Sequence, residues 1–256
     1  MSGATVVPLP TPDRERGAAV VFGVGASAGT GAALCRRFAR EGLPVYAAGR
    51  TAERLETLAR EIRGAGGRAT AAPADVTRTE DVTRLLDRAA AECGRLELVA
   101  YNAGNNRFRP LLEMDDAFFE GLWRVCCFGG FVVGREAARR MLPFAAGSIL
   151  FTGATASLRA RPPFTAFASA KAALRAVAHG MAREFGPRGI HVAHVVIDGG
   201  IEGETLLQRF PQLAEQRGPG GLLQPDAIAD AFWALHVQHP SAWSLELDLR
   251  PYKEPF

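Results

Sequence analysis

The stretch VVFGVGASAGTGAAL, residues 20–34, decides the fold of this chain. It begins as a short apolar run, of the kind buried on both faces of a parallel sheet, and ends as a helical pattern. Gly25, Gly29 and Gly31 lie between the two with the spacing G-x-x-x-G-x-G. Glycines at such a turn let the backbone approach a pyrophosphate, which then faces the free N–H groups of the helix start. The stretch therefore predicts a nucleotide-binding βαβ unit; the alternative is a glycine-rich turn without a ligand.

The same alternation of apolar runs and amphipathic helical patterns continues along the chain. Seven strands are expected, within residues 18–25, 44–50, 68–76, 96–104, 147–154, 190–198 and 242–250. There is no internal repeat and no linker long enough to divide the sequence. The pattern predicts a single Rossmann-type α/β domain over residues 18–256, a doubly wound parallel sheet with helices on both faces. Residues 1–17 are predicted to form a flexible N-terminal arm.

Composition excludes several classes of protein. The 256 residues are 48% hydrophobic and 22% charged, and the formal net charge of +3 is too small to indicate a nucleic-acid partner. The four cysteines show neither metal-ligand spacing nor a disulfide framework, which suits a reducing compartment. The start of the sequence lacks the regions of a signal peptide, and no apolar run approaches the length of a membrane span. We expect a cytoplasmic protein that binds no metal and no membrane.

The end of the second expected strand indicates which nucleotide is bound. NAD sites commonly place an acidic residue there to bind the ribose 2′-hydroxyl. This chain has Gly49 at that position, followed by Arg50 and Thr51. A guanidinium group suits a 2′-phosphate, and Thr51 can add a hydroxyl and an N–H. The pattern favours NADP(H), although a solvated surface arginine is the simpler reading of Arg50.

From about Gly17 onward the chain resembles the short-chain dehydrogenase/reductase family. The resemblance rests on the glycine turn, on ADV at residues 74–76, on YNAG at residues 101–104, and on AREFGPRGIHVAHV at residues 182–195. It implies an oxidoreductase that forms a homodimer or homotetramer. It also implies cofactor contacts beyond the glycines and Arg50, at Ser27, Thr30, Thr51, Asp75, Val76, Asn102, Ala103, Gly104 and Lys171.

Members of this family typically carry Asn, Ser, Tyr and Lys as a catalytic set, in which the Tyr exchanges a proton with the substrate oxygen. At the matching positions this chain has Cys126, Ala154, Phe167 and Lys171. The interval from Ala154 to Phe167 equals the family's Ser-to-Tyr interval, which argues against a shifted alignment. Only the lysine is kept, and its family role is to hold the nicotinamide ribose. We expect cofactor binding to survive and ordinary carbonyl–alcohol chemistry to be weak.

Two residues are candidates to replace the missing acid. Thr155 follows the empty serine position, and Asp198 ends the sixth expected strand, at the edge where such sheets bind ligands. An Asp before two glycines is equally often a turn residue. Together with Lys171, they form the predicted catalytic set.

The residues around these positions predict an apolar pocket for a small molecule. Cys126, Ala154, Phe164 and Phe167 are expected to line it. Arg159 or Arg161 could attract an anionic substrate, but the alternative is a solvated loop.

Three functions remain open on these residues. The first is an NADP(H)-dependent oxidoreductase of atypical mechanism, with a substrate such as an activated C=C or an imine, which needs hydride more than a proton on oxygen. The second is a nucleotide-binding sensor or scaffold without a redox step. The third is a lyase or isomerase that uses Thr155 or Asp198.

Overall fold

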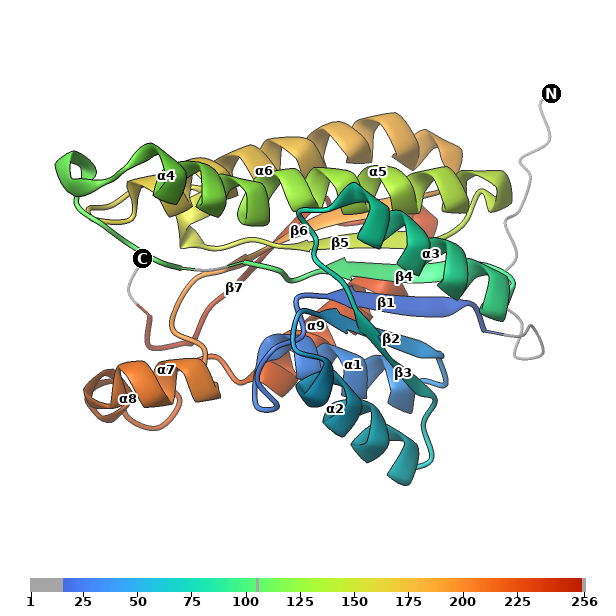
Figure 1. The fold of residues 1–256 in the computed structure, drawn as a ribbon, viewed down its shortest axis with the longest axis horizontal. Coiled ribbons are helices and arrows are strands. Elements are labelled where there is room, and N and C mark those ends of the chain that lie inside the picture. Colours follow the sequence, from blue (N-terminus) through green and yellow to red (C-terminus); the bar gives the residue numbers. More distant parts are fainter. Residues whose placement is uncertain (1–15, 105, 255–256) are drawn as a thin grey trace.

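The computed structural model describes residues 16–104 and 106–254, which form one sheet covered by helices on both faces (Figure 1). The sheet has seven parallel strands in the order β3-β2-β1-β4-β5-β6-β7, which confirms the predicted architecture. The strands are β1 Ala18–Phe22, β2 Val45–Gly49, β3 Ala69–Pro73, β4 Leu96–Tyr101, β5 Ser148–Thr152, β6 His191–Ile197 and β7 Glu246–Leu249. The predicted N-terminal arm lies almost wholly outside the described residues.

Two apolar cores separate the helices from the sheet. One face is covered by α1 Thr30–Arg40, α2 Ala52–Gly64 and α9 Pro225–His236, whose apolar sides pack on β1, β2, β4, β5 and β6. The other face is covered by α3 Thr79–Cys93, α5 Gly129–Met141 and α6 Thr165–Phe185. Every residue of β1 is fully buried, because this central strand contacts both layers. That burial explains why the strand reads as a continuous apolar run.

The long helical segment before β5 is one axis built from three pieces. α4 Asp116–Trp123 passes into a π-helical turn, Arg124–Phe128, and then into α5. The Tyr101 hydroxyl at the end of β4 donates a hydrogen bond to the Val125 carbonyl inside that turn. By length and composition the stretch Asp116–Phe144 could cross a membrane, contrary to our reading of the sequence. In the fold its second half, α5, is a core helix that packs on α3, β4 and α6, while most residues of α4 are exposed.

The remaining elements are short and lie at the ends of the sheet. They are the 3-10 turns Leu111–Glu113, Leu142–Phe144, Thr155–Ser157, Gly186–Arg188 and Pro240–Ala242, and the helices α7 Glu204–Arg209 and α8 Pro211–Arg217. α7 and α8 follow β6 and project from the carboxyl end of the sheet (Figure 1). The strand order reverses at β1, so the loops after β1 and β4 diverge at that same end. In open α/β sheets this is where ligands bind.

Candidate active site

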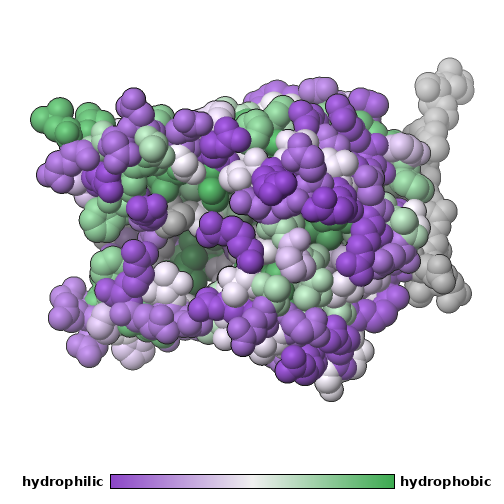
Figure 2. All heavy atoms as spheres, in the orientation of Figure 1, coloured by the Kyte–Doolittle hydropathy of each residue, from purple (hydrophilic) through white to green (hydrophobic). Residues whose placement is uncertain are grey.

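A cavity of about 630 Å³ opens at the carboxyl end of the sheet. In Figure 2 the same face is hollowed between the lobe of α4 and the lobe of α7 and α8, with apolar atoms at its floor and polar atoms around its rim. Its wall includes these residues predicted to bind the nucleotide: Gly25, Gly29, Thr30, Gly31, Asn102, Gly104 and Lys171. The remaining residues predicted to bind the nucleotide do not line the cavity: Ser27, Arg50, Thr51, Asp75, Val76 and Ala103. Arg50 and Thr51 are exposed at the end of β2 and Asp75 follows β3, on the side of the glycine turn away from Lys171.

The glycine turn has the shape that a pyrophosphate needs. A Cβ on Gly31 would lie 2.7 Å from the Gly23 carbonyl oxygen, so only glycine lets α1 start this close to β1. A Cβ on Gly25 would meet no described atom within 4 Å, so the turn leaves open space where a side chain would stand. Within the described residues, no side chain caps the start of α1. Its first N–H groups are therefore free to bind an anion.

The packing around Gly49 explains why the acid of an NAD site is missing. A Cβ at this position would lie 2.2 Å from the Val24 carbonyl oxygen. No side chain fits there unless the glycine turn moves. Arg50, the next residue, is exposed beside the start of α2, where its guanidinium group is free to turn toward a phosphate. Arg50 is thus the charged residue that directly follows Gly49 at this edge.

A chain of hydrogen bonds connects the glycine turn to Lys171. The Asn102 Nδ2 donates to the Gly23 carbonyl at 3.1 Å, and the Thr152 hydroxyl donates to Asn102 Oδ1 at 3.1 Å. The Lys171 Nζ donates to the Thr152 carbonyl at 2.7 Å. Lys171 is 4% exposed, and burial lowers the pKa of its ammonium group below the ordinary value. The lysine is thus held in place at the cavity wall before any cofactor binds.

The structure brings Ala154 and Phe167 together with Lys171, as the sequence predicted. Both Ala154 and Phe167 line the cavity, and the Lys171 Nζ lies 5.8 Å from the centre of the Phe167 ring. No tyrosine lines the cavity in the described part of the chain. Tyr101, which ends the neighbouring strand, is fully buried, and burial raises its pKa well above the ordinary value. It cannot serve as the missing acid.

The prediction that Cys126 lines the pocket is wrong. Its side chain is fully buried in a small apolar cluster with Leu122, Cys127, Ala166 and Ala170, where α4 and the π-helical turn pack on α6. A Cβ on Gly104, which lines the cavity beside Lys171, would lie 3.9 Å from the Cys126 Sγ, so the thiol lies directly behind the cavity wall. Phe164, by contrast, lines the cavity as predicted, and its ring packs against Phe108 at a centroid distance of 5.1 Å.

Thr155 and Asp198 form a pair at the cavity wall. The Thr155 hydroxyl donates to the Asp198 carboxylate at 2.5 Å. Thr155 lines the cavity, whereas Asp198 is 5% exposed and lies behind it. Arg250 Nη2 lies 3.0 Å from the same carboxylate, and Arg159 Nη2 lies 3.9 Å from it. Because the hydroxyl proton points to Asp198, the Thr155 oxygen presents its lone pairs to the cavity.

A second polar network lies behind β5. The Ser157 hydroxyl is 3.3 Å from His194 Nε2, and His194 Nδ1 is 3.0 Å from Glu246. Arg175 binds the same carboxylate through two nitrogens, at 2.6 and 2.8 Å. Although the order Ser–His–Glu resembles a hydrolase triad, Ser157 is 4% exposed and does not line the cavity. The network is structural: it anchors the turn that carries Thr155, since Ser157 also accepts from the Ala154 N–H.

This network predicts a loss of stability in mild acid. Burial lowers the pKa of His194 from 6.5 to about 4, so the unfolded chain takes up the proton more readily than the folded one. Stability is then full above about pH 6.5 and falls as the pH drops toward 4, by roughly 3 kcal/mol from this group alone. The hydrogen bond from Arg175 holds the pKa of Glu246 at about 2, so its contribution is lost only below its ordinary 4.5.

Urea unfolding from pH 7 to pH 5 measures this slope. His194→Gln should flatten it, while a substitution of the exposed His239 by Gln should leave it unchanged. An equally steep slope in His194→Gln would show that another group, such as the buried His191, controls acid unfolding.

Two arginines that bear on the site were not predicted from the sequence. Arg250 pairs with Asp198 because β7 runs beside β6 with Leu249 opposite Ile197. Arg209 lines the cavity from the end of α7. In the sequence, each of these two arginines is marked only by its position after the end of a strand. Such a position does not show which way the following segment folds.

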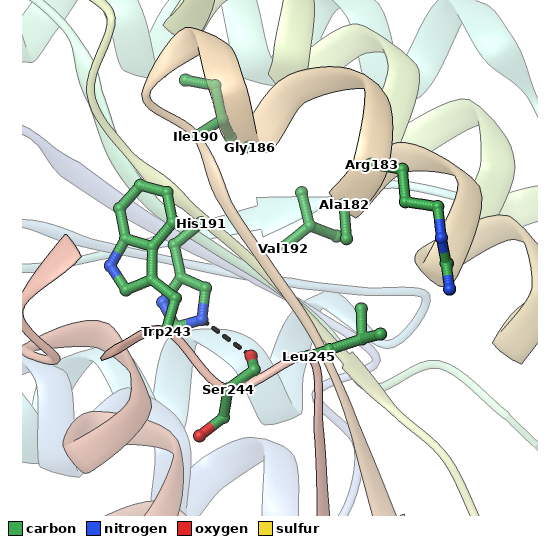
Figure 3. A pocket seen from close by; sticks show the side chains of 9 residues that line it. All are labelled: Ala182, Arg183, Gly186, Ile190, His191, Val192, Trp243, Ser244 and Leu245. Atoms are coloured by element: carbon green, nitrogen blue, oxygen red, sulfur yellow. Dashed lines mark hydrogen bonds between the residues drawn. The ribbon is translucent and has the colours of Figure 1, made fainter. Parts of the chain in front are cut away.

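A second cavity, of about 260 Å³, lies where the amino end of β6 meets the segment before β7 (Figure 3). The His191 and Trp243 rings stack there with centroids 4.8 Å apart, and His191 Nε2 donates to the Ser244 carbonyl at 2.9 Å. None of the predicted site residues lines this cavity. The candidate site is therefore the larger cavity alone.

Comparison with known proteins identifies the family to which a chain with this fold and these motifs belongs. The short chain dehydrogenase family matches residues 19–210. An uncharacterized oxidoreductase of Bacillus subtilis, YuxG, is 33% identical over 88% of this chain, which spans 33% of that protein's length. An A-factor type gamma-butyrolactone 1'-reductase of Streptomyces virginiae is 35% identical over 73% of this chain and 74% of its own length.

A solved structure gives the same result at higher identity. The crystal structure of a short-chain dehydrogenase from Rhodopseudomonas palustris is 43% identical and superimposes with a TM-score of 0.80, over 93% of this chain and all of that one. The order of the strands, the glycine turn at β1 and the lysine of α6 are thus found together with a family match over most of the sequence. The chain belongs to the short-chain dehydrogenase family.

Proposed function

We propose that this protein is an NADP(H)-dependent oxidoreductase that reduces an activated C=C bond or an imine. The observation that carries the proposal is one continuous cavity, which joins the glycine turn and the buried Lys171 to the Thr155–Asp198 pair. Phe167 and Ala154 line the same cavity, at the positions where the family would place a tyrosine and a serine. The site therefore combines the glycine turn and the lysine that a nicotinamide cofactor needs with a hydrogen-bond acceptor, the Thr155 oxygen. This acceptor takes the place of the acid that the family uses.

Different residues of the chain would perform different parts of such a reaction. The glycine turn and Arg50 would hold the phosphates of the nucleotide, and Lys171 would hold the nicotinamide ribose. A bound nicotinamide cofactor supplies the hydride. The Thr155 oxygen, whose proton is engaged by Asp198, can accept a hydrogen bond from an N–H of the substrate. Phe164 and Phe167 provide an apolar surface that excludes water from the reacting carbon.

The polarity of this pair favours particular substrates. A ketone needs a donor at its oxygen as the hydride arrives, and Thr155 offers a lone pair instead. A protonated imine brings its own proton, and its N–H can bind the Thr155 oxygen directly. An activated C=C bond receives the hydride at carbon, and water can protonate the product afterwards. Both need less from a general acid than a ketone does.

A panel of three probe substrates tests the proposal. With saturating NADPH, we expect a cyclic imine such as methylpyrroline, or cyclohexenone, to be reduced, and cyclohexanone to be reduced at least about a hundredfold more slowly. NADPH oxidation is followed by absorbance, and products by mass spectrometry. Ordinary turnover of cyclohexanone would contradict the reading of the site. Tight NADPH binding without reduction of any probe would favour a nucleotide-binding sensor or scaffold.

The choice of nucleotide gives a separate prediction. Arg50→Ala should weaken NADPH binding by roughly tenfold or more, because one charge-assisted pair with the 2′-phosphate is lost, and should leave NADH binding unchanged. Fluorescence titration of both nucleotides measures the change. Arg60→Ala, on the exposed side of α2, is the matched control. Equal affinity of the unsubstituted protein for both nucleotides would rule out this role for Arg50.

A further inference from the structure

Three guanidinium groups line the outer part of the cavity, beyond Thr155 and Phe167. Arg159 and Arg161 follow the 3-10 turn after β5, and Arg209 ends α7. These two segments lie far apart in the chain and meet only at this cavity. Among the described lining residues the one carboxylate is Glu204, which accepts a hydrogen bond from Gln208 at 3.2 Å. The outer cavity is therefore positively charged.

The charges of these arginines are only weakly compensated within the chain. Arg159 lies 3.9 Å from Asp198, whose carboxylate is already 3.0 Å from Arg250. Arg161 and Arg209 have no ion pair in the part of the chain that the structure describes. Elsewhere, arginines that face a carboxylate bind it closely, as Arg175 binds Glu246. The guanidinium groups at the cavity thus keep their donors available for a ligand.

Apolar side chains stand beside these charges. Phe164 and Phe167 line the cavity from the α6 side, and Leu206 and Phe210 line it from the α7 side. A ligand between them would bury an apolar body and keep a charged end at the rim. A cleft with walls of low polarity also strengthens the attraction between such charges and an anion.

We infer that the substrate carries an anionic oxygen group, a carboxylate or a phosphate, on an apolar body, and that Arg209 binds this group together with Arg159 or Arg161. Guanidinium groups match both anions because two parallel N–H donors meet two oxygens. The inference deepens the proposed function and rests on it for the position of the reacting carbon. It adds one feature of the substrate, the anionic group that the arginines would bind.

Matched ligands test this directly through binding. Naphthoate, its neutral amide naphthamide and naphthyl phosphate share one apolar body and differ in the end group. Their intrinsic fluorescence reports binding to the full chain, measured without nucleotide and with saturating NADP⁺, which keeps the phosphate ligand out of the glycine turn. We expect the preferred anion to bind at least about tenfold more tightly than naphthamide, with an affinity that falls as salt is added.

Substitutions identify the groups responsible. Arg209→Gln, and separately Arg159→Gln with Arg161→Gln, should each weaken binding of the preferred anion by about tenfold and change naphthamide binding less than twofold. Arg188→Gln, at the opposite end of the sheet before β6, is the matched control and should change neither. All four positions are exposed, so folding should survive the changes, and thermal unfolding checks this.

The possible results test this inference independently of the proposed function. Preference for naphthoate assigns a carboxylate, and preference for naphthyl phosphate with NADP⁺ present assigns a phosphate. Equal affinities for the anions and naphthamide, or no binding of any of them below about 10 mM, a conventional limit for weak ligands, overturn the inference. Such a result with NADPH binding and imine reduction intact leaves the proposed function standing. Anion selectivity without NADPH binding would instead overturn the proposed function and leave the arginine site.

Discussion

A double variant, Phe167→Tyr with Ala154→Ser, is expected to reduce cyclohexanone at least about a hundredfold faster than the unsubstituted chain. A positioned general acid contributes about 10² to 10⁴ in rate, and this change restores one beside a lysine that is already in place. The Phe167 ring centre lies 5.8 Å from Lys171 Nζ, and both substituted positions line the cavity. The new hydroxyl is larger than the ring hydrogen it replaces, and the cavity that Phe167 lines gives it room.

The measurement is kcat/KM for cyclohexanone at saturating NADPH. Phe210→Tyr is the control, because it places a phenol on the opposite wall of the same cavity, away from Lys171. The rate should rise toward higher pH in the oxidation of cyclohexanol as the new phenol loses its proton. If neither cyclohexanone reduction nor cyclohexanol oxidation becomes faster, the cavity does not bring a substrate oxygen close to positions 154 and 167.

The second large effect is expected from Thr155→Val. This change keeps the shape of the side chain and removes the oxygen that would accept a hydrogen bond from the charged imine, so reduction of the imine should fall by about a hundredfold. Asp198 keeps its partner Arg250 at 3.0 Å in the variant, so the carboxylate is not left alone in the protein interior. kcat/KM for methylpyrroline and the affinity for NADPH are measured together, and the affinity should not change.

Two further variants show whether the hydroxyl itself matters. Thr155→Ser should restore most of the rate, since it returns the oxygen without the methyl group. Thr165→Val removes a nearby hydroxyl at the start of α6 that does not line the cavity, and should have little effect. If Thr155→Val reduces the imine at the unsubstituted rate, the Thr155–Asp198 pair is structural and the reaction uses no acceptor at this position.

The fold could be predicted from the sequence because its signals are local. β1 is buried on both faces and is therefore a continuous apolar run, and the glycine turn after it needs close backbone approach at Gly31. Each strand and helix carries such a pattern in a few consecutive residues. Alternating strands and helices with right-handed crossovers then give a doubly wound parallel sheet. The structure confirmed the seven parallel strands of this architecture.

The site could be predicted only where a motif fixes a position on a strand or helix. Ala154, Phe167 and Lys171 met as expected because β5 and α6 are rigid and neighbouring. Cys126 was misplaced because its side chain is buried in the cluster where the π-helical turn packs on α6, and the letters RVCCF do not reveal such a turn. Arg209 was missed because only the path of the segment after β6 brings it to the cavity.

The contact between Gly153 and His194 limits the routes by which this site could change. A Cβ at position 153 would lie 2.3 Å from His194 Nε2, and the imidazole is held there by Glu246. A side chain at 153 is therefore tolerated only after position 194 has become smaller. Position 154, next to it, faces the cavity and accepts a serine at once. A lineage or a library that explores position 153 must therefore change His194 first, although His194 does not line the cavity.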